Sequence, residues 1–146
     1  TLTSRLGVSV RDDAGLTYGV SSRFFGTLGL AGPWATHLGV AAGNVDRAVA
    51  MCREIIAEYA ASGPAVDELA DERTARAGAY RVGLATNSGL ARELVTTLTA
   101  GESVGHLDRY PEQLLATSRD EVIEALRRHI RPDELVLTAA GTFETQ

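Results

Sequence analysis

Apolar side chains in the N-terminal part of the chain change from a helical spacing to an alternating one. Leu6 and Val10 share one face of a predicted helix over residues 3–14, and Gly15 is a suitable stop. Residues 17–25 and 34–42 alternate between apolar and polar positions, which predicts two strands. One side of the first strand is predicted to carry Tyr18, Val20, Ser22 and Phe24. One side of the second is predicted to carry Trp34, Thr36, Leu38 and Val40.

The helical spacing dominates the rest of the chain. It predicts helices over residues 45–59, 67–101 with a break at 87–89, 110–116 and 118–131. Asn44 is a suitable N-cap for the first of them. Ser118 and Glu121 have the spacing of a capping box at the start of the last. The apolar run over residues 135–140 predicts a final buried strand.

The order helix, hairpin, several helices, strand indicates an α+β fold, in which a layer of helices packs on a mostly antiparallel sheet. Three strands are few for so many helices. We therefore expect residues 1–146 to form a single, incomplete domain that lacks its first strands. The missing strands would leave a surface open to a partner chain or to self-association into a homo-oligomer.

Composition narrows the classes of function. The 146 residues are 45% hydrophobic and 23% charged, as in soluble globular proteins, and no apolar run could span a membrane. A net charge of −5 argues against nucleic-acid binding. All 14 basic residues are arginine, which excludes Schiff-base chemistry and a P-loop lysine. The N-terminal residues show no secretory signal, so we expect a cytoplasmic protein.

Common catalytic motifs are missing from the sequence. His37, His106 and His129 fall in a strand, a loop and a helix end, and neither H-E-x-x-H nor H-x-x-E-H occurs, so we expect no metal site in this chain. There is no G-x-S-x-G elbow. The glycines at 26, 29 and 32 precede a strand rather than a helix, which favours a hairpin loop over a dinucleotide site. Cys52 lies on an apolar helix stripe and is predicted to be a buried thiol.

Arg11 and Tyr18 are the candidate site residues. A helix ends near Arg11, the chain turns at Gly15, and Tyr18 begins a strand. Two hydrogen-bond donors at adjoining element ends could grip a peptide carbonyl or carboxylate. In the alternative interpretation, Arg11 pairs with a neighbouring aspartate and Tyr18 packs in the core.

The same stretch carries a resemblance to a known family. Ser4-Arg5-Leu6 and the run Arg11-Asp12-Asp13-Ala14-Gly15-Leu16-Thr17-Tyr18 resemble a characteristic segment of pitrilysin/insulinase-type zinc peptidases, the inverzincins. Weaker similarities follow in the same order, at Gly43-Asn44, Val66–Leu69, Thr117–Val122 and Leu135–Gly141. Gly43 departs from the family pattern, in which glutamate is usual.

The resemblance implies one half of a two-half zinc endopeptidase that closes around an unfolded peptide. The zinc and its H-x-x-E-H motif would belong to a homologous domain or subunit, and this chain would be inactive alone. Arg11 and Tyr18, seven residues apart, match the Arg and Tyr that reach the substrate beside the metal. The alternative is a catalytically inactive structural member of the same fold, similar to the core proteins of the respiratory cytochrome complex.

Overall fold

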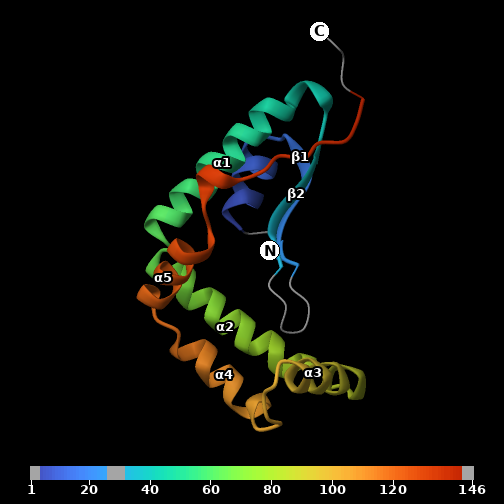
Figure 1. Cartoon of the computed structure of the whole chain (residues 1–146), viewed down its shortest axis with the longest axis vertical. Coiled ribbons are helices and arrows are strands. Elements are labelled where there is room, and N and C mark those ends of the chain that lie inside the picture. The colour runs from blue at the N-terminus through green and yellow to red at the C-terminus, as the bar shows by residue number, and fades with distance from the viewer. Residues whose placement is uncertain (1–3, 26–31, 143–146) are drawn as a thin grey trace. The chain divides into compact units, whose positions relative to one another are not determined.

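The computed structural model describes residues 4–25 and 32–142, which form two compact units (Figure 1). The first unit contains residues 4–25, 32–62 and 126–142, and the second contains residues 63–125. The prediction that residues 1–146 form one folding domain stays a prediction.

The first unit combines a short helix, a hairpin and one long helix. Its elements are the π-helix η1 (Gly7–Asp13), strands β1 (Thr17–Phe24) and β2 (Trp34–Val40), the 3-10 turn η2 (Ala42–Asn44), α1 (Val45–Ser62) and the 3-10 turn η3 (Pro132–Glu134). β1 and β2 pair antiparallel, and the Phe25 N–H extends the pairing by donating to the Pro33 carbonyl at 2.8 Å. The predicted hairpin is thereby confirmed, although residues 26–31 of its loop lie outside the described residues.

The core of the first unit lies between η1, the hairpin and α1. Val10 is completely buried, and five further buried side chains surround it: Leu6, Leu16, Ala48, Cys52 and Ile56. Val20, Leu38 and Val40 add a partly buried layer from the sheet. The spacing of Ala48, Cys52 and Ile56 is four residues, so one stripe of α1 covers this layer. Because these residues share one buried stripe, the apolar residues of α1 recur at helical spacing in the sequence.

The second unit is helical. It contains α2 (Val66–Gly83), α3 (Asn87–Thr99), α4 (His106–Ala116) and the start of α5 (Arg119–His129). α4 contacts both α2 and α3. Arg73 on α2 donates to the carbonyls of Leu115 and Thr117, at 3.2 and 2.6 Å, and so satisfies carbonyls that the end of α4 leaves without helical partners.

Helix boundaries lie within about four residues of the predicted positions. The predicted break between two helices is present but lies at residues 84–86 rather than 87–89, because α2 ends at Gly83 and α3 starts at Asn87. The Thr86 hydroxyl caps α3 by accepting the Gly89 N–H at 3.0 Å. The capping box is also confirmed: the Ser118 N–H donates to the Glu121 carboxylate at 2.7 Å, and the Glu121 N–H donates to the Ser118 hydroxyl at 3.2 Å. α4 starts at His106, four residues before the predicted helix.

The α+β fold class is confirmed, but the predicted strand over residues 135–140 is wrong. This segment pairs with no strand in the part of the chain that the structure describes. Leu135 packs against the core and its carbonyl accepts a hydrogen bond from Arg53 of α1, whereas Val136 is 91% exposed. A strand requires a neighbouring edge for its backbone groups, and here the segment is held by α1 instead.

No helix among the described residues is both long and apolar enough to cross a membrane.

The burial of Val10 generates a stability prediction. Val10→Ala should lower the free energy of unfolding by about 2 kcal/mol, because it removes two methyl groups from a fully buried site. Urea denaturation followed by circular dichroism measures the change. Val136→Ala is the matched control, and its effect should stay within about 0.5 kcal/mol because that side chain is exposed. Equal losses in the two variants would contradict the assignment of the core.

Candidate functional site

A tight reversal at Gly15 connects η1 to β1. Gly15 has φ +62°, in the left-handed region that glycine adopts without a steric penalty. The Gly15 N–H donates to the Arg11 carbonyl at 3.1 Å, and the Leu16 N–H donates to the Val10 carbonyl at 3.0 Å. The reversal therefore places Arg11 in the last turn of η1 and brings Tyr18 to the start of β1, as the sequence predicted.

β1 contains a bulge at Tyr18 and Gly19. Thr17 is opposite Val40, and Val20 is opposite Leu38. Two residues of β1 therefore face one residue of β2, Gly39, which is the defining count of a β-bulge. The extra residue changes which side chains share a face of the strand.

The bulge overturns one prediction about β1. The alternation in the sequence placed Tyr18 on the same side as Val20, but Val20 packs against the core while Tyr18 is fully exposed. The alternative interpretation in which Tyr18 packs in the core is therefore wrong. On β2 the predicted alternation is confirmed, since Trp34, Leu38 and Val40 all pack against the core.

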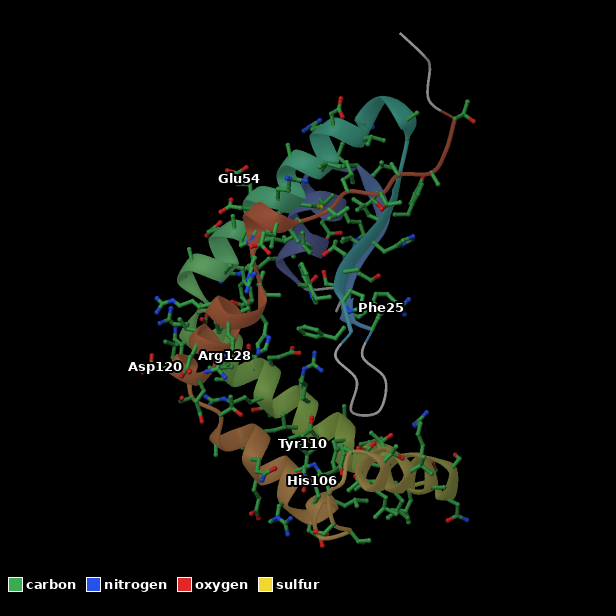
Figure 2. All side chains as sticks on the ribbon, in the orientation of Figure 1. Phe25, Glu54, His106, Tyr110, Asp120 and Arg128 are labelled. Carbon is green, nitrogen blue, oxygen red and sulfur yellow. The ribbon has the colours of Figure 1, made fainter. Side chains whose placement is uncertain are left out.

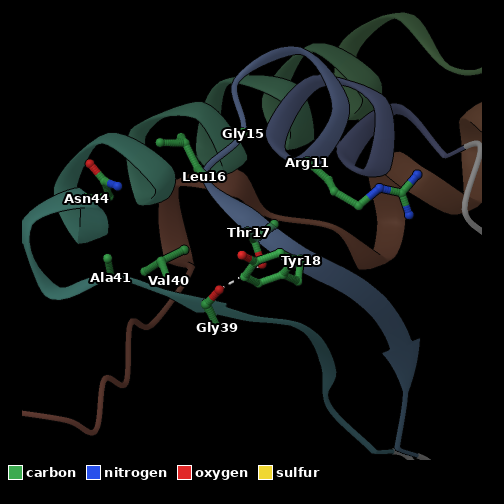
Figure 3. A pocket seen from close by; sticks show the side chains of 9 residues that line it. All are labelled: Arg11, Gly15, Leu16, Thr17, Tyr18, Gly39, Val40, Ala41 and Asn44. Carbon is green, nitrogen blue, oxygen red and sulfur yellow. Dashed lines mark hydrogen bonds between the residues drawn. The ribbon is translucent and has the colours of Figure 1, made fainter.

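A hollow of about 640 Å³ opens beside the bulge (Figure 3). Arg11 and Tyr18 both line it, so one surface depression is shared by the two candidate residues. Figure 3 shows the Arg11 guanidinium directed away from the Tyr18 ring, which lies beside Thr17 and Gly39. The remaining lining residues are Gly15, Leu16, Thr17, Gly39, Val40, Ala41 and Asn44.

Asp12 binds the Arg11 guanidinium with both carboxylate oxygens. Arg11 Nε donates to Asp12 Oδ1 at 2.7 Å and Nη2 donates to Oδ2 at 2.9 Å. This hydrogen bond raises the pKa of Arg11 and lowers the pKa of Asp12. The pairing of Arg11 with a neighbouring aspartate, one part of the alternative interpretation, is therefore present. It coexists with the position of Arg11 on the hollow.

The histidines do not make a zinc site with the residues that the structure describes. His37 is on β2, His106 begins α4 and His129 ends α5. His106 Nδ1 lies 3.8 Å from a Glu102 carboxylate oxygen, and its ring packs against Tyr110 (Figure 2). Within residues 4–25 and 32–142, no three His, Cys, Asp or Glu side chains are grouped as metal ligands. A structural zinc site requires four such ligands and a catalytic one requires three.

Cys52 is buried in α1, as predicted, and burial raises the pKa of its thiol. A buried thiol of raised pKa is a poor nucleophile because the thiolate is the reactive form. Cys52 is therefore a core residue.

Comparison with known families gives a match over residues 1–76 to the family described as peptidase M16 inactive domain. The match covers more than half of the 146 residues. The chain belongs to the peptidase M16 inactive-domain family. The resemblance to insulinase-type peptidases is thereby confirmed, and the chain corresponds to a non-catalytic part of the peptidase fold.

Two solved structures support the same fold. A peptidase M16 inactive domain from Pseudomonas fluorescens is 26% identical, with a TM-score of 0.83 over 92% of this chain. A protease from Helicobacter pylori is 12% identical, with a TM-score of 0.68 over 90% of this chain, which is a likeness of fold alone. The chain spans 32% of each of those chains, about a third. None of the curated proteins matches it.

Sequence reasoning overlooked Thr17, the buried residue beside Tyr18. Its hydroxyl lies 2.7 Å from the Gly39 carbonyl and accepts the Gly19 N–H at 3.1 Å. The available signal was Gly19, because a glycine inside a strand pattern often marks a bulge. The alternation alone gave no reason to expect one.

The Arg11–Asp12 pair predicts a change in the titration of Asp12. Arg11→Ala should raise the pKa of Asp12 towards its ordinary value, because the variant removes the hydrogen bonds that favour the carboxylate. Carboxyl-carbon NMR titration measures the shift. The pKa of Glu121, lowered by its hydrogen bonds to Ser118, should not move. An unchanged Asp12 titration would show that the pair does not form in solution.

The lowered pKa of Asp12 determines how the Arg11–Asp12 pair changes the stability of the chain with pH. The Arg11–Asp12 pair stabilises the folded chain above the ordinary pKa of an aspartate, and this contribution is lost as pH falls through the lowered value. Arg11→Ala should therefore show a weaker loss of stability on acidification than the wild-type chain.

The scattered histidines predict that the chain holds no tightly bound zinc. After dialysis against zinc-free buffer, elemental analysis should find far less than one zinc per chain. One zinc retained per chain would show that side chains separated in this structure converge on a metal, and would contradict the assignment.

Proposed function

We propose that this chain is the substrate-binding, non-zinc half of a zinc metalloendopeptidase, in which Arg11 and Tyr18 grip the peptide. The observation that carries the proposal is the shared hollow at the Gly15 reversal. Membership of the inactive-domain family supports it, since a homologous half would then supply the zinc and its H-x-x-E-H motif. The partners are that zinc-binding domain or subunit and an unfolded peptide, and the location is the cytoplasm.

The two side chains suit a peptide carbonyl in different ways. The Arg11 guanidinium is a permanent cation with five N–H donors, and Asp12 uses two of these in the chain as it stands. The Tyr18 hydroxyl is fully exposed and can donate to an acceptor on the peptide. Donors held in place before the reaction stabilise charge that develops on a carbonyl oxygen more than they stabilise the neutral carbonyl.

The role proposed for this chain follows from the residues that it contains. Zinc bound in the homologous half would supply Lewis-acid polarisation of the scissile carbonyl. This chain would orient the peptide and donate hydrogen bonds, which requires no metal ligand of its own. Its isolated form is therefore proposed to be inactive. Pairing with the zinc-binding half is preferred over self-association, because only that half provides the missing chemistry.

Substitution of the two donors tests the proposal in the enzyme assembled with its zinc-binding half. Arg11→Ala and Tyr18→Phe should each lower kcat for fluorescein-labelled casein by about 100-fold or more, the usual cost of losing one oxyanion donor. Circular dichroism should show unchanged folds, because neither side chain belongs to the buried core.

Matched controls come from α1. Arg47→Ala removes an exposed arginine and Tyr59→Phe removes the hydroxyl of a half-buried tyrosine, and both should leave kcat within a factor of two or so, as is usual for changes away from a site. Full turnover in both Arg11→Ala and Tyr18→Phe would contradict the proposal. The chain would then be assigned to the structural, catalytically inactive class.

A further inference from the structure

We propose that the Thr17 hydroxyl is a positioning group for Tyr18, because it holds the bulge that turns the tyrosine away from the core. This inference rests on the proposed function for its effect on turnover. Its structural part stands independently, since the direction of the Tyr18 side chain can be observed without any substrate.

The Thr17 hydroxyl contacts backbone groups of both strands at the bulge. Thr17 is one of two buried polar residues found in the described part of the chain. Its hydroxyl lies 2.7 Å from the Gly39 carbonyl of the opposite strand and 2.8 Å from the Gly19 carbonyl, and it accepts the Gly19 N–H at 3.1 Å. The Thr17 hydroxyl therefore accepts from the Gly19 N–H and has a carbonyl acceptor on each strand within reach of its single proton. The dashed line in Figure 3 marks its bond to Gly39 of β2.

The competing arrangement is a regular ladder. The pairs beyond the bulge are Val20 with Leu38, Ser22 with Thr36 and Phe24 with Trp34. The Ser22 and Thr36 hydroxyls are 2.8 Å apart, and Val20 and Leu38 pack on the core, so this part of the register is well fixed.

Extending that ladder without a bulge would place Tyr18 opposite Val40. Side chains alternate along a strand, so Tyr18 would then share the core face with Val20. The sequence pattern alone predicts that arrangement. With the bulge, Thr17 occupies the core side instead and Tyr18 faces outward at the hollow. The bulge thus decides whether the tyrosine is a core residue or a site residue.

The threonine hydroxyl is suited to favour the bulge. In the bulge the Gly19 N–H donates to the Thr17 hydroxyl, and the Gly19 carbonyl lies 2.8 Å from the same oxygen. A hydroxyl can accept and donate at the same time, which a valine or alanine side chain cannot do. Removing it should therefore shift the strand towards the regular register.

The first test measures the exposure of Tyr18 directly. The chain is labelled with 3-fluorotyrosine, and 19F NMR records line broadening by a soluble paramagnetic agent, with the resonance assigned through Tyr18→Phe. Tyr18 should be strongly broadened in the wild type and in Thr17→Ser, which keeps the hydroxyl. It should be protected in Thr17→Val. The comparison of Thr17→Ser with Thr17→Ala isolates the hydroxyl if Thr17→Val does not fold. Equal broadening in hydroxyl-bearing and hydroxyl-free variants would overturn the proposal.

The second test measures turnover of fluorescein-labelled casein by the enzyme assembled with its zinc-binding half. Thr17→Val should lower kcat by between about tenfold and 100-fold, a typical cost of misplacing a catalytic group, and Thr17→Ser should restore most of it. In a Tyr18→Phe background the same substitution should have no further effect, because the group that it positions is gone. Additive losses would show that Thr17 acts on the fold rather than through Tyr18.

The two tests separate the two proposals. If Tyr18→Phe keeps full turnover, the proposed function fails, while the NMR comparison still decides whether Thr17 directs the tyrosine. If Tyr18→Phe loses turnover but Thr17→Ala leaves both kcat and exposure at the level of Thr17→Ser, the proposed function stands and the positioning role is refuted.

Discussion

The β-bulge at Tyr18 and Gly19 is the constraint on which the proposed site depends. Arg11 and Tyr18 are seven positions apart, and the hollow that both line is formed around two backbone irregularities, the reversal at Gly15 and the bulge. The Gly15 reversal brings the two elements together. The bulge then gives Tyr18 its outward direction, and the buried Val10 and Leu16 anchor the stretch to α1.

Most of the helical structure could be read from the sequence because its signals are local. The Ser118–Glu121 capping box and the break before α3 are satisfied by hydrogen bonds within four residues, so nearby side chains determine them. The direction of Tyr18 was not readable in the same way. It depends on a contact between Thr17 and Gly39 that spans 22 residues, and an alternating pattern assumes a regular ladder. The predicted strand over residues 135–140 failed for a related reason: apolar character marks a segment as buried, but strand formation also needs an edge to pair with.

The site combines an electrostatic feature with a steric one. Asp12 holds the Arg11 guanidinium through two donors and thereby limits its conformations. Tyr18 lies exposed on strand β1 rather than on a loop. In the proposed function, these two donors belong to a surface that completes a site held by another domain. This proposal agrees with the lengths of the solved structures, because the chain spans about a third of each protein whose fold it shares.

Photo-crosslinking from position 18 tests the central claim most directly. In the enzyme assembled with its zinc-binding half, Tyr18 is replaced by p-benzoylphenylalanine and the complex is irradiated with fluorescein-labelled casein. The account predicts transfer of the fluorescein label to this chain, at a level well above that obtained with the same photoreactive residue in place of Tyr59 on α1. Equal labelling from the two positions would show that the Arg11–Tyr18 hollow does not hold the substrate, and would contradict the account.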